Sequence, residues 1–215
     1  MMKVLIAAGL AENADFKLFN AADFDAVIGV DAGALWALNQ SLTLDTAVGD
    51  FDSIGAEDFR RLSETGTELL KFKPEKDETD LELALALALR KYPEAEITVT
   101  GALGGRLDHE LTNIYLPITE KFAKFAEQIK LVNSQNYVQY LTKAGEHILP
   151  RLEGMKYIGF VKVNAANFSI SNAKYPLKVE DNFAEIYASN EFIAETMTVS
   201  FTSGCVIVIY SNDKK

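Results

Sequence analysis

The stretch Thr46-Ala47-Val48-Gly49-Asp50-Phe51-Asp52-Ser53 decides how the first half of the chain is interpreted. The apolar run 46–48 has the pattern of a buried strand, and two carboxylates separated by one residue follow it directly. Ligands of open α/β sheets bind at strand ends, and two acids on such a loop are able to share a hard cation. The alternative is that Asp52 or Ser53 caps a helix beginning near Glu57. The stretch alone does not separate these interpretations.

The composition narrows the class of protein. The chain has 215 residues, of which 48% are hydrophobic and 24% are charged, as in ordinary globular proteins. Its formal net charge of −10 argues against nucleic acid or an anionic membrane as a partner, because both require a basic face. The sequence carries no recognisable secretory leader and no apolar run of membrane-spanning length. We therefore expect a cytoplasmic enzyme or binding protein.

Short apolar runs alternate with helical patterns from residue 1 to about residue 125, which predicts βαβ units and a mainly parallel sheet. The expected helices are 34–38, 57–65 and 81–92. The last of these alternates like a strand, but its strong helix formers and the capping box Thr79-x-x-Glu82 favour a helix. The expected strands are 4–8, 26–30, 46–48, 68–72 and 97–100.

Beyond about residue 125, short β-branched or aromatic runs are separated by turn residues, which predicts an antiparallel β-sandwich. We therefore expect two domains, an α/β domain over 1–125 and an all-β domain over 126–215. The expected strands of the second domain are 129–133, 137–141, 147–149, 157–163, 168–170, 184–188, 197–201 and 205–210.

Acidic residues follow the second, third, fourth and fifth of the expected first-half strands. Because parallel strands bring their carboxyl ends to one edge, these acids should line one crevice, a composition that suits metal-bound polyphosphate. Magnesium usually takes only one or two protein carboxylates, so Asp50, Asp52 and Asp77 exceed the needs of one ion. Either some of them hold the ligands rather than the ion, or two ions bind. The acids of this group are Asp31, Asp50, Asp52, Asp77, Asp80 and Asp108, with Lys76 beside Asp77.

A glycine cluster after the fifth strand offers a second phosphate contact. Backbone N–H groups can come close to a phosphate at Gly101, Gly104 and Gly105. Arg106 can donate two hydrogen bonds to the phosphate oxygens. The alternative is that these glycines form an ordinary strand-to-helix turn.

Asp77 and Asp80 also have an alternative to a role in ligand binding, which is a favourable interaction with the dipole of the helix that begins there. The sequence contains neither a P-loop nor a dinucleotide fingerprint, and its two histidines make a zinc cluster implausible.

Taken in order, the motifs resemble those of the thiamine pyrophosphokinase (thiamine diphosphokinase) family. The resemblance covers nearly the whole chain, and one departure is Ala32, where the family commonly has a second glycine. The matching segments are Asp31-Ala32-Gly33-Ala34, Gly49-Asp50-Phe51-Asp52-Ser53, Lys76-Asp77-Glu78-Thr79-Asp80, Gly104-Gly105-Arg106-Leu107-Asp108-His109 and Lys174-Tyr175-Pro176-Leu177 followed by Ser189-Asn190-Glu191-Phe192.

The resemblance implies a homodimer that binds thiamine between subunits and transfers the pyrophosphoryl group of ATP to the thiamine hydroxyl, giving thiamine diphosphate and AMP. It implies that Asp50, Asp52 and Asp77 organise magnesium on ATP, with Arg106 and Asp108 at the reacting end. The other implied nucleotide contacts are Asp31, Gly33, Lys76, Thr79, Asp80, Gly101, Gly104 and Gly105, and the implied thiamine contacts are Ser189, Asn190 and Asp108.

Two alternatives remain at this point. The first-half motifs describe ATP and metal better than the acceptor, so a pyrophosphokinase for another alcohol, such as a hydroxymethylpterin, is the nearest rival. A non-catalytic nucleotide-binding module is the other. The joint presence of the expected catalytic residues argues against it, namely Asp50, Asp52, Asp77, Arg106 and Asp108. Transfer to a neutral alcohol needs alignment and charge neutralisation more than a protein nucleophile. We expect Asp108 to act as the base or to orient the alcohol.

Overall fold

The structure, a computed structural model, describes residues 1–11, 20–52, 54–72 and 77–213, which form two compact units. The first unit contains residues 1–116 and 128–134, and the second contains 117–127 and 135–215. No helix in the described ranges combines the length and hydropathy needed to cross a bilayer.

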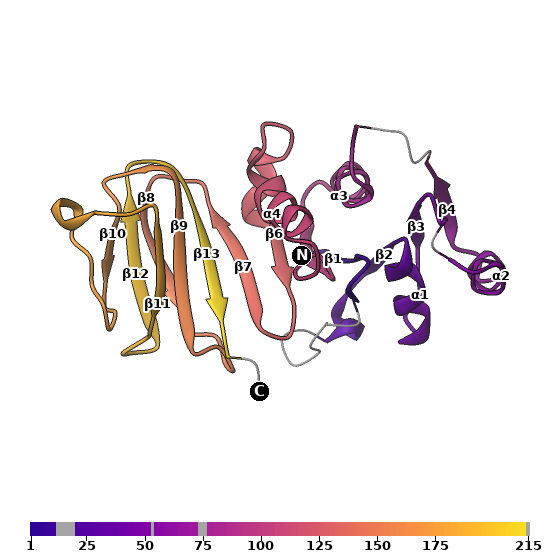
Figure 1. Ribbon diagram of the computed structural model, residues 1–215, viewed down its shortest axis with the longest axis horizontal. Helices are drawn as coiled ribbons and strands as arrows, with labels where there is room; N and C mark the ends of the chain where they lie inside the picture. The colour runs from indigo at the N-terminus through magenta and orange to yellow at the C-terminus, as the bar shows by residue number, and fades with distance from the viewer. Residues whose placement is uncertain (12–19, 53, 73–76, 214–215) are drawn as a thin grey trace. The chain divides into compact units, whose positions relative to one another are not determined.

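The first unit is an α/β domain built on a parallel sheet, as the sequence predicts (Figure 1). Its strands lie in the order β6-β5-β1-β2-β3-β4, and every pair is parallel. The central strands are near-continuous apolar runs because both of their faces are covered. The elements are β1 (Lys3–Ala7), β2 (Ala26–Val30), α1 (Ala32–Asn39), β3 (Thr46–Gly49), α2 (Ala56–Glu64), β4 (Glu68–Lys71), α3 (Asp80–Lys91), β5 (Glu96–Thr100), α4 (Leu107–Tyr115) and β6 (Ile129–Val132).

Two sequence interpretations in this unit have different outcomes. The N-cap half of the expected capping box is present before α3, since the Thr79 hydroxyl accepts a hydrogen bond from the backbone N–H of Glu82 at 3.1 Å. The segment 129–133, in contrast, was expected in the all-β half, but β6 pairs in parallel with β5. A short apolar run does not reveal its pairing direction, because parallel and antiparallel partners bury the same side chains.

The second unit is an all-β antiparallel domain (Figure 1). Within it, one set of strands lies in the order β11-β9-β13-β7 and the other in the order β10-β12-β8. The Tyr210 hydroxyl of β13 donates to the Pro150 carbonyl of β8 at 3.1 Å, which joins the two sets. The elements are β7 (Asn136–Leu141), β8 (Gly145–Pro150), β9 (Tyr157–Ala166), β10 (Ser169–Ser171), β11 (Ile186–Asn190), β12 (Thr196–Phe201) and β13 (Ser203–Ser211).

The strand order of the first unit determines where a ligand is expected. The chain runs from β1 outward through β2 and β3 to β4, and then returns to place β5 on the other side of β1. The order therefore reverses between β1 and β5, and the loops leaving these strands diverge there. Open α/β sheets bind ligands in the crevice at this switch point.

Candidate active site

A cavity of about 550 Å³ opens at the switch point between β1 and β5. This volume falls within the range of small-ligand sites, about 300–1,000 Å³. The lining comes from the loops that follow β1, β2 and β5 and from the starts of α3 and α4. The lining residues are Ala8, Gly9, Leu10, Val30, Asp31, Glu78, Thr79, Asp80, Leu81, Gly101, Ala102, Gly104, Gly105, Arg106, His109 and Asn113.

The glycine cluster forms one wall of this cavity. Gly101 has a φ of 76° and lies so close to the β1 loop that a Cβ atom would come within 2.5 Å of the Ala8 carbonyl oxygen. Two side chains of α4 hold the cluster in place. Glu110 Oε1 accepts from the backbone N–H of Gly104 at 3.0 Å, and Asn113 Nδ2 donates to the Ala102 carbonyl at 2.8 Å. The glycine loop is therefore shaped by the helix that follows it.

Arg106 and Asp108 form a two-pronged ion pair at the start of α4. Arg106 Nη2 lies 2.7 Å from Asp108 Oδ2, and Nε donates to Oδ1 at 3.2 Å. The hydrogen bond from Arg106 lowers the pKa of Asp108, and the same bond raises the pKa of Arg106. Both side chains are well exposed, at 73% and 65%, so the pair is accessible to a ligand.

The ends of β2 and β3 bring Asp31 next to Gly49. The backbone N–H of Asp31 donates to the Val48 carbonyl at 3.0 Å, and a Cβ atom on Gly49 would lie 1.8 Å from Asp31 Oδ1. Asp31 adopts a φ of 48°, which is uncommon for a residue other than glycine. Glycine at position 49 thus lets the Asp31 carboxylate lie against the end of the neighbouring strand.

All three of the expected metal-binding acids are among the described residues. Asp50 Oδ1 accepts from the backbone N–H of Asp52 at 3.0 Å, while Asp52 and Asp77 are exposed. Within the described ranges, no group of three or more His, Cys, Asp or Glu side chains is placed to hold a metal ion, and Asp50, Asp52, Asp77 and Asp108 lie outside the cavity lining. Lys76 and Ser53 lie outside the described residues.

The other expected nucleotide contacts lie at helix starts. Gly33 is buried in the first turn of α1. Thr79 caps α3, and Asp80 is the first residue of that helix. Thr79 and Asp80 also line the cavity, so one short segment combines the cap with the cavity wall.

The second unit holds a smaller cavity beside Asn190, with a volume of about 270 Å³. The Asn190 side chain is buried and bonded to the backbone: Oδ1 accepts from the N–H groups of Tyr175 and Glu191 at 3.0 and 2.9 Å, and Nδ2 donates to the Tyr175 carbonyl at 2.8 Å. Asn190 thus fixes the main chain of Tyr175. Ser189 is exposed, with a φ of 60°. The cavity is lined by Ile170, Tyr175, Pro176, Leu177, Phe183, Ile186, Tyr187, Ala188 and Asn190.

Sequence reasoning missed several residues of both cavities. The loop Ala8, Gly9 and Leu10 was detectable, because β1 is a central strand whose carboxyl end should carry site residues. Glu110 and Asn113 carried no such signal, since their contacts depend on how α4 folds back onto the glycine loop.

The chain is similar to known proteins over most of its length. Residues 17–131 match the family model described as "Thiamin pyrophosphokinase, catalytic domain", and residues 146–206 match "Thiamin pyrophosphokinase, vitamin B1 binding domain". Thiamine pyrophosphokinase of Bacillus subtilis (strain 168) is 36% identical over 193 residues, covering 86% of this chain and 87% of the relative. Thiamine pyrophosphokinase 1 of Oryza sativa subsp. japonica is 30% identical over 170 residues, covering 74% of this chain and 62% of the relative.

A solved structure agrees with these sequence matches. The crystal structure of a thiamin pyrophosphokinase family protein from Enterococcus faecalis superposes with a TM-score of 0.89 at 38% identity, covering 99% of this chain and 100% of the other. The two-unit α/β and all-β architecture is therefore shared over the full length. From both family models and these relatives, the chain belongs to the thiamin pyrophosphokinase family.

Proposed function

We infer that this chain is an ATP-dependent thiamine pyrophosphokinase, which converts ATP and thiamine to AMP and thiamine diphosphate. The observation that carries this conclusion is the match of one polypeptide to both the catalytic and the vitamin B1 binding models of the family. The cavity at the switch point of the first unit supports the nucleotide half of the reaction, because its glycine wall and Arg106 suit phosphate oxygens.

The reaction requires attack of the thiamine hydroxyl oxygen on the β-phosphorus of ATP. The new O–P bond forms as the bond from the β-phosphorus to the oxygen shared with the α-phosphate breaks, and AMP leaves. Arg106 neutralises charge on the phosphate oxygens, while Asp108 orients the hydroxyl and accepts its proton. Support comes from the position of both residues at the start of α4 and from their ion pair at 2.7 Å.

We propose magnesium as the ion bound with ATP, where it would neutralise charge on the triphosphate. Asp50, Asp52 and Asp77 would hold it. The donor chemistry fits, because carboxylate oxygens are the ligands that this ion prefers, and Asp31 and Asp50 follow the ends of neighbouring parallel strands.

We further propose that residues 1–125 bind ATP and magnesium, that residues 126–215 bind thiamine, and that the protein is a cytoplasmic homodimer. Support for self-association comes from α4, where Leu107, Leu111 and Tyr115 are 67%, 48% and 41% exposed at a spacing of four residues. Side chains four apart share one helix face, so α4 presents an apolar row that a second copy would cover.

The experiment that tests the proposed function compares acceptors. The purified chain is incubated with ATP and magnesium, and with either thiamine or a hydroxymethylpterin. We expect AMP to form only with thiamine. AMP formation with the pterin alone would establish the rival acceptor, and failure of both acceptors would support a non-catalytic nucleotide-binding module.

A further inference from the structure

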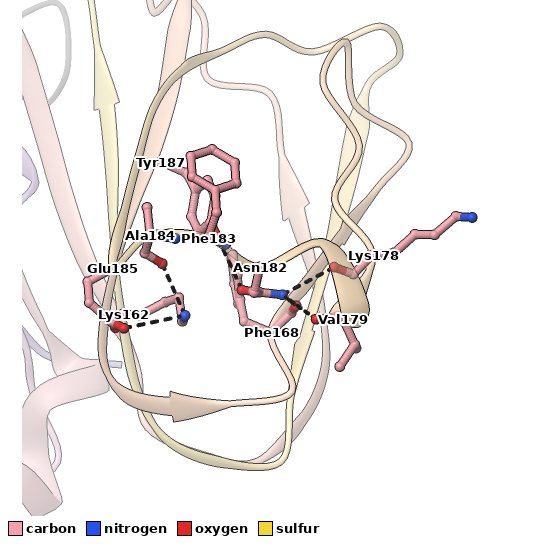
Figure 2. Close-up of polar contacts among 9 residues, drawn as sticks. All are labelled: Lys162, Phe168, Lys178, Val179, Asn182, Phe183, Ala184, Glu185 and Tyr187. Atoms are coloured by element: carbon pink, nitrogen blue, oxygen red, sulfur yellow. Dashed lines mark hydrogen bonds and ion pairs between the residues drawn. The ribbon is translucent and has the colours of Figure 1, made fainter.

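A short segment of the second unit, residues 182–185, is held by hydrogen bonds beyond those of regular secondary structure. The amide of Asn182 donates to the carbonyl groups of Phe168, Lys178 and Val179 at 2.7, 3.1 and 3.0 Å, as Figure 2 shows. These bonds close the turn that contains the 3-10 helix η5 (Val179–Asp181) and anchor it to the residue preceding β10.

The hydroxyl group of Tyr187 fixes the same segment from β11. It accepts from the backbone N–H groups of Phe183 and Ala184 at 3.1 and 3.2 Å, and it donates to Asn182 Oδ1 at 3.3 Å. One donor and two acceptor sites are the full capacity of a tyrosine hydroxyl. Tyr187 therefore uses all of its hydrogen-bonding capacity within this turn and has none left for a ligand.

Lys162 adds a third attachment from β9. Its side chain is only 10% exposed, and Nζ donates to the Ala184 carbonyl at 3.1 Å and lies 3.8 Å from Glu185 Oε1 (Figure 2). An ammonium group removed from water requires such partners. The backbone on both sides of Phe183 is thus fixed by side chains from two neighbouring strands.

The side chain that this network presents is itself exposed. Phe183 is 84% exposed, and its ring lies edge-on to the Tyr187 ring with centroids 5.3 Å apart. Both rings line the 270 Å³ cavity, together with Tyr175, which is 57% exposed. The fully buried ring of Phe168 also stacks on the Tyr187 ring, with centroids 6.0 Å apart. A rigid backbone with exposed aromatic rings around an apolar cavity is suited to a flat ring.

We propose that Asn182 and Tyr187 are positioning residues of the acceptor site, which hold the Phe183 ring where it contacts the heteroaromatic ring of thiamine. This inference rests on the proposed function, and the match of residues 146–206 to the vitamin B1 binding model includes all three residues. Asn182 and Tyr187 act through Phe183, because their polar groups bond to the protein itself.

The test uses Tyr187→Phe, which retains the ring contacts and removes only the hydroxyl. We expect KM for thiamine to rise about 5- to 10-fold, in line with the loss of hydrogen bonds worth about a factor of ten, while KM for ATP and kcat stay within about 2-fold. Asn182→Asp, which keeps the oxygen acceptor and loses the amide donors, should behave similarly. Calorimetric titration of each variant with thiamine alone supplies a binding readout that does not depend on turnover.

A double substitution separates positioning from general destabilisation. If Tyr187 acts through Phe183, Tyr187→Phe should raise KM for thiamine in the wild-type chain but have no further effect in a Phe183→Ala background. Tyr157→Phe is the control, because its hydroxyl also takes part in hydrogen bonds, here with the side chains of Lys156 and Asp213, but lies outside the cavity lining.

The outcomes distinguish this inference from the proposed function. An unchanged KM and unchanged binding of thiamine in Tyr187→Phe, in a chain that does make thiamine diphosphate, would overturn the positioning role alone. A lower kcat together with similar increases in the KM for thiamine and the KM for ATP, accompanied by a lower melting temperature, would also overturn it. Absence of thiamine diphosphate with the wild-type chain would instead refute the proposed function.

Discussion

Arg106 holds the carboxylate of Asp108 through two of its nitrogen atoms, at 2.7 and 3.2 Å. The group proposed to neutralise phosphate charge is therefore hydrogen-bonded to the group proposed to accept the proton of the acceptor hydroxyl. A ligand that draws Arg106 onto its phosphate oxygens would release Asp108 toward the acceptor. We therefore predict that binding of the nucleotide is coupled to release of the Asp108 carboxylate.

Replacing Asp108 with asparagine tests its proposed role directly. The amide keeps the shape of the side chain but cannot accept the proton of the hydroxyl. We expect kcat to fall about 100-fold or more, the usual contribution of a positioned acid or base, with the KM for ATP little changed. Steady-state measurement of AMP formation checks this, and near-normal turnover would refute the role.

The pH dependence of turnover should reveal the ion pair. Because Arg106 lowers the pKa of Asp108, the carboxylate stays ionised to a lower pH than an ordinary aspartate. Activity that depends on this carboxylate is present above the folded-state pKa and is lost as the pH falls through it. In Arg106→Gln the pKa of Asp108 returns toward its usual value, so the acid limb of the kcat/KM profile should move to higher pH.

The profiles of Arg106→Gln and of the wild-type chain are measured at saturating magnesium. Both are measured over a pH range in which the ionisation of the substrates does not change. An acid limb that stays at the same pH, in a variant that still turns over, would show that a group other than Asp108 controls it.

Gly49→Ala is predicted to disturb the contact between β2 and β3. The added Cβ would lie 1.8 Å from Asp31 Oδ1, so the strand end or the aspartate must shift. We expect a loss of about 1–3 kcal/mol in the free energy of unfolding, typical of overpacking, together with weaker binding of ATP. Urea denaturation and nucleotide titration measure the two effects.

The matched control for that substitution is Gly55→Ala at the start of α2. A Cβ atom at Gly55 meets nothing within 4 Å. Alanine is a clearly poorer N-cap than glycine, so we expect a loss of no more than about 1 kcal/mol in the free energy of unfolding, from the cap alone. Equal stability of Gly49→Ala and the wild-type chain would contradict the packing argument.

Glu110→Ala should loosen the glycine loop. Its carboxylate accepts from the Gly104 N–H, and without it that wall of the nucleotide cavity loses an attachment to α4. We expect KM for ATP to rise about 5-fold, corresponding to one hydrogen bond, with KM for thiamine unchanged. Glu94→Ala, at an exposed position before β5, is the control. A rise confined to the KM for thiamine would contradict the assignment of this cavity to ATP.

Much of the fold could be predicted because its signals are local. The apolar run before Gly49, the N-cap at Thr79 and the short β-branched or aromatic runs of the second half are each recognised from neighbouring residues, and the structure contains the corresponding elements. The pairing of β6 with β5 could not be predicted, because 129–133 has the composition of either a parallel or an antiparallel strand. Its partner is determined by tertiary packing.

The site was predictable at the level of loops rather than contacts. Parallel topology correctly places Asp31, Thr79, Asp80, Gly101 and Arg106 around one cavity, but the other acids expected there, Asp50, Asp52, Asp77 and Asp108, do not line it. It was not enough to show that the Asn190 amide bonds to the Tyr175 backbone, or that Glu110 reaches Gly104. These contacts depend on side-chain direction after folding, which the spacing of residues along the chain does not specify.

The central claim is pyrophosphoryl transfer to thiamine, and phosphorus-31 NMR of a single incubation tests it most directly. The chain is mixed with magnesium and equimolar ATP and thiamine, and all phosphorus products are followed together. The account predicts AMP and thiamine diphosphate in equal amounts, with no thiamine monophosphate intermediate. Appearance of ADP together with thiamine monophosphate would contradict it.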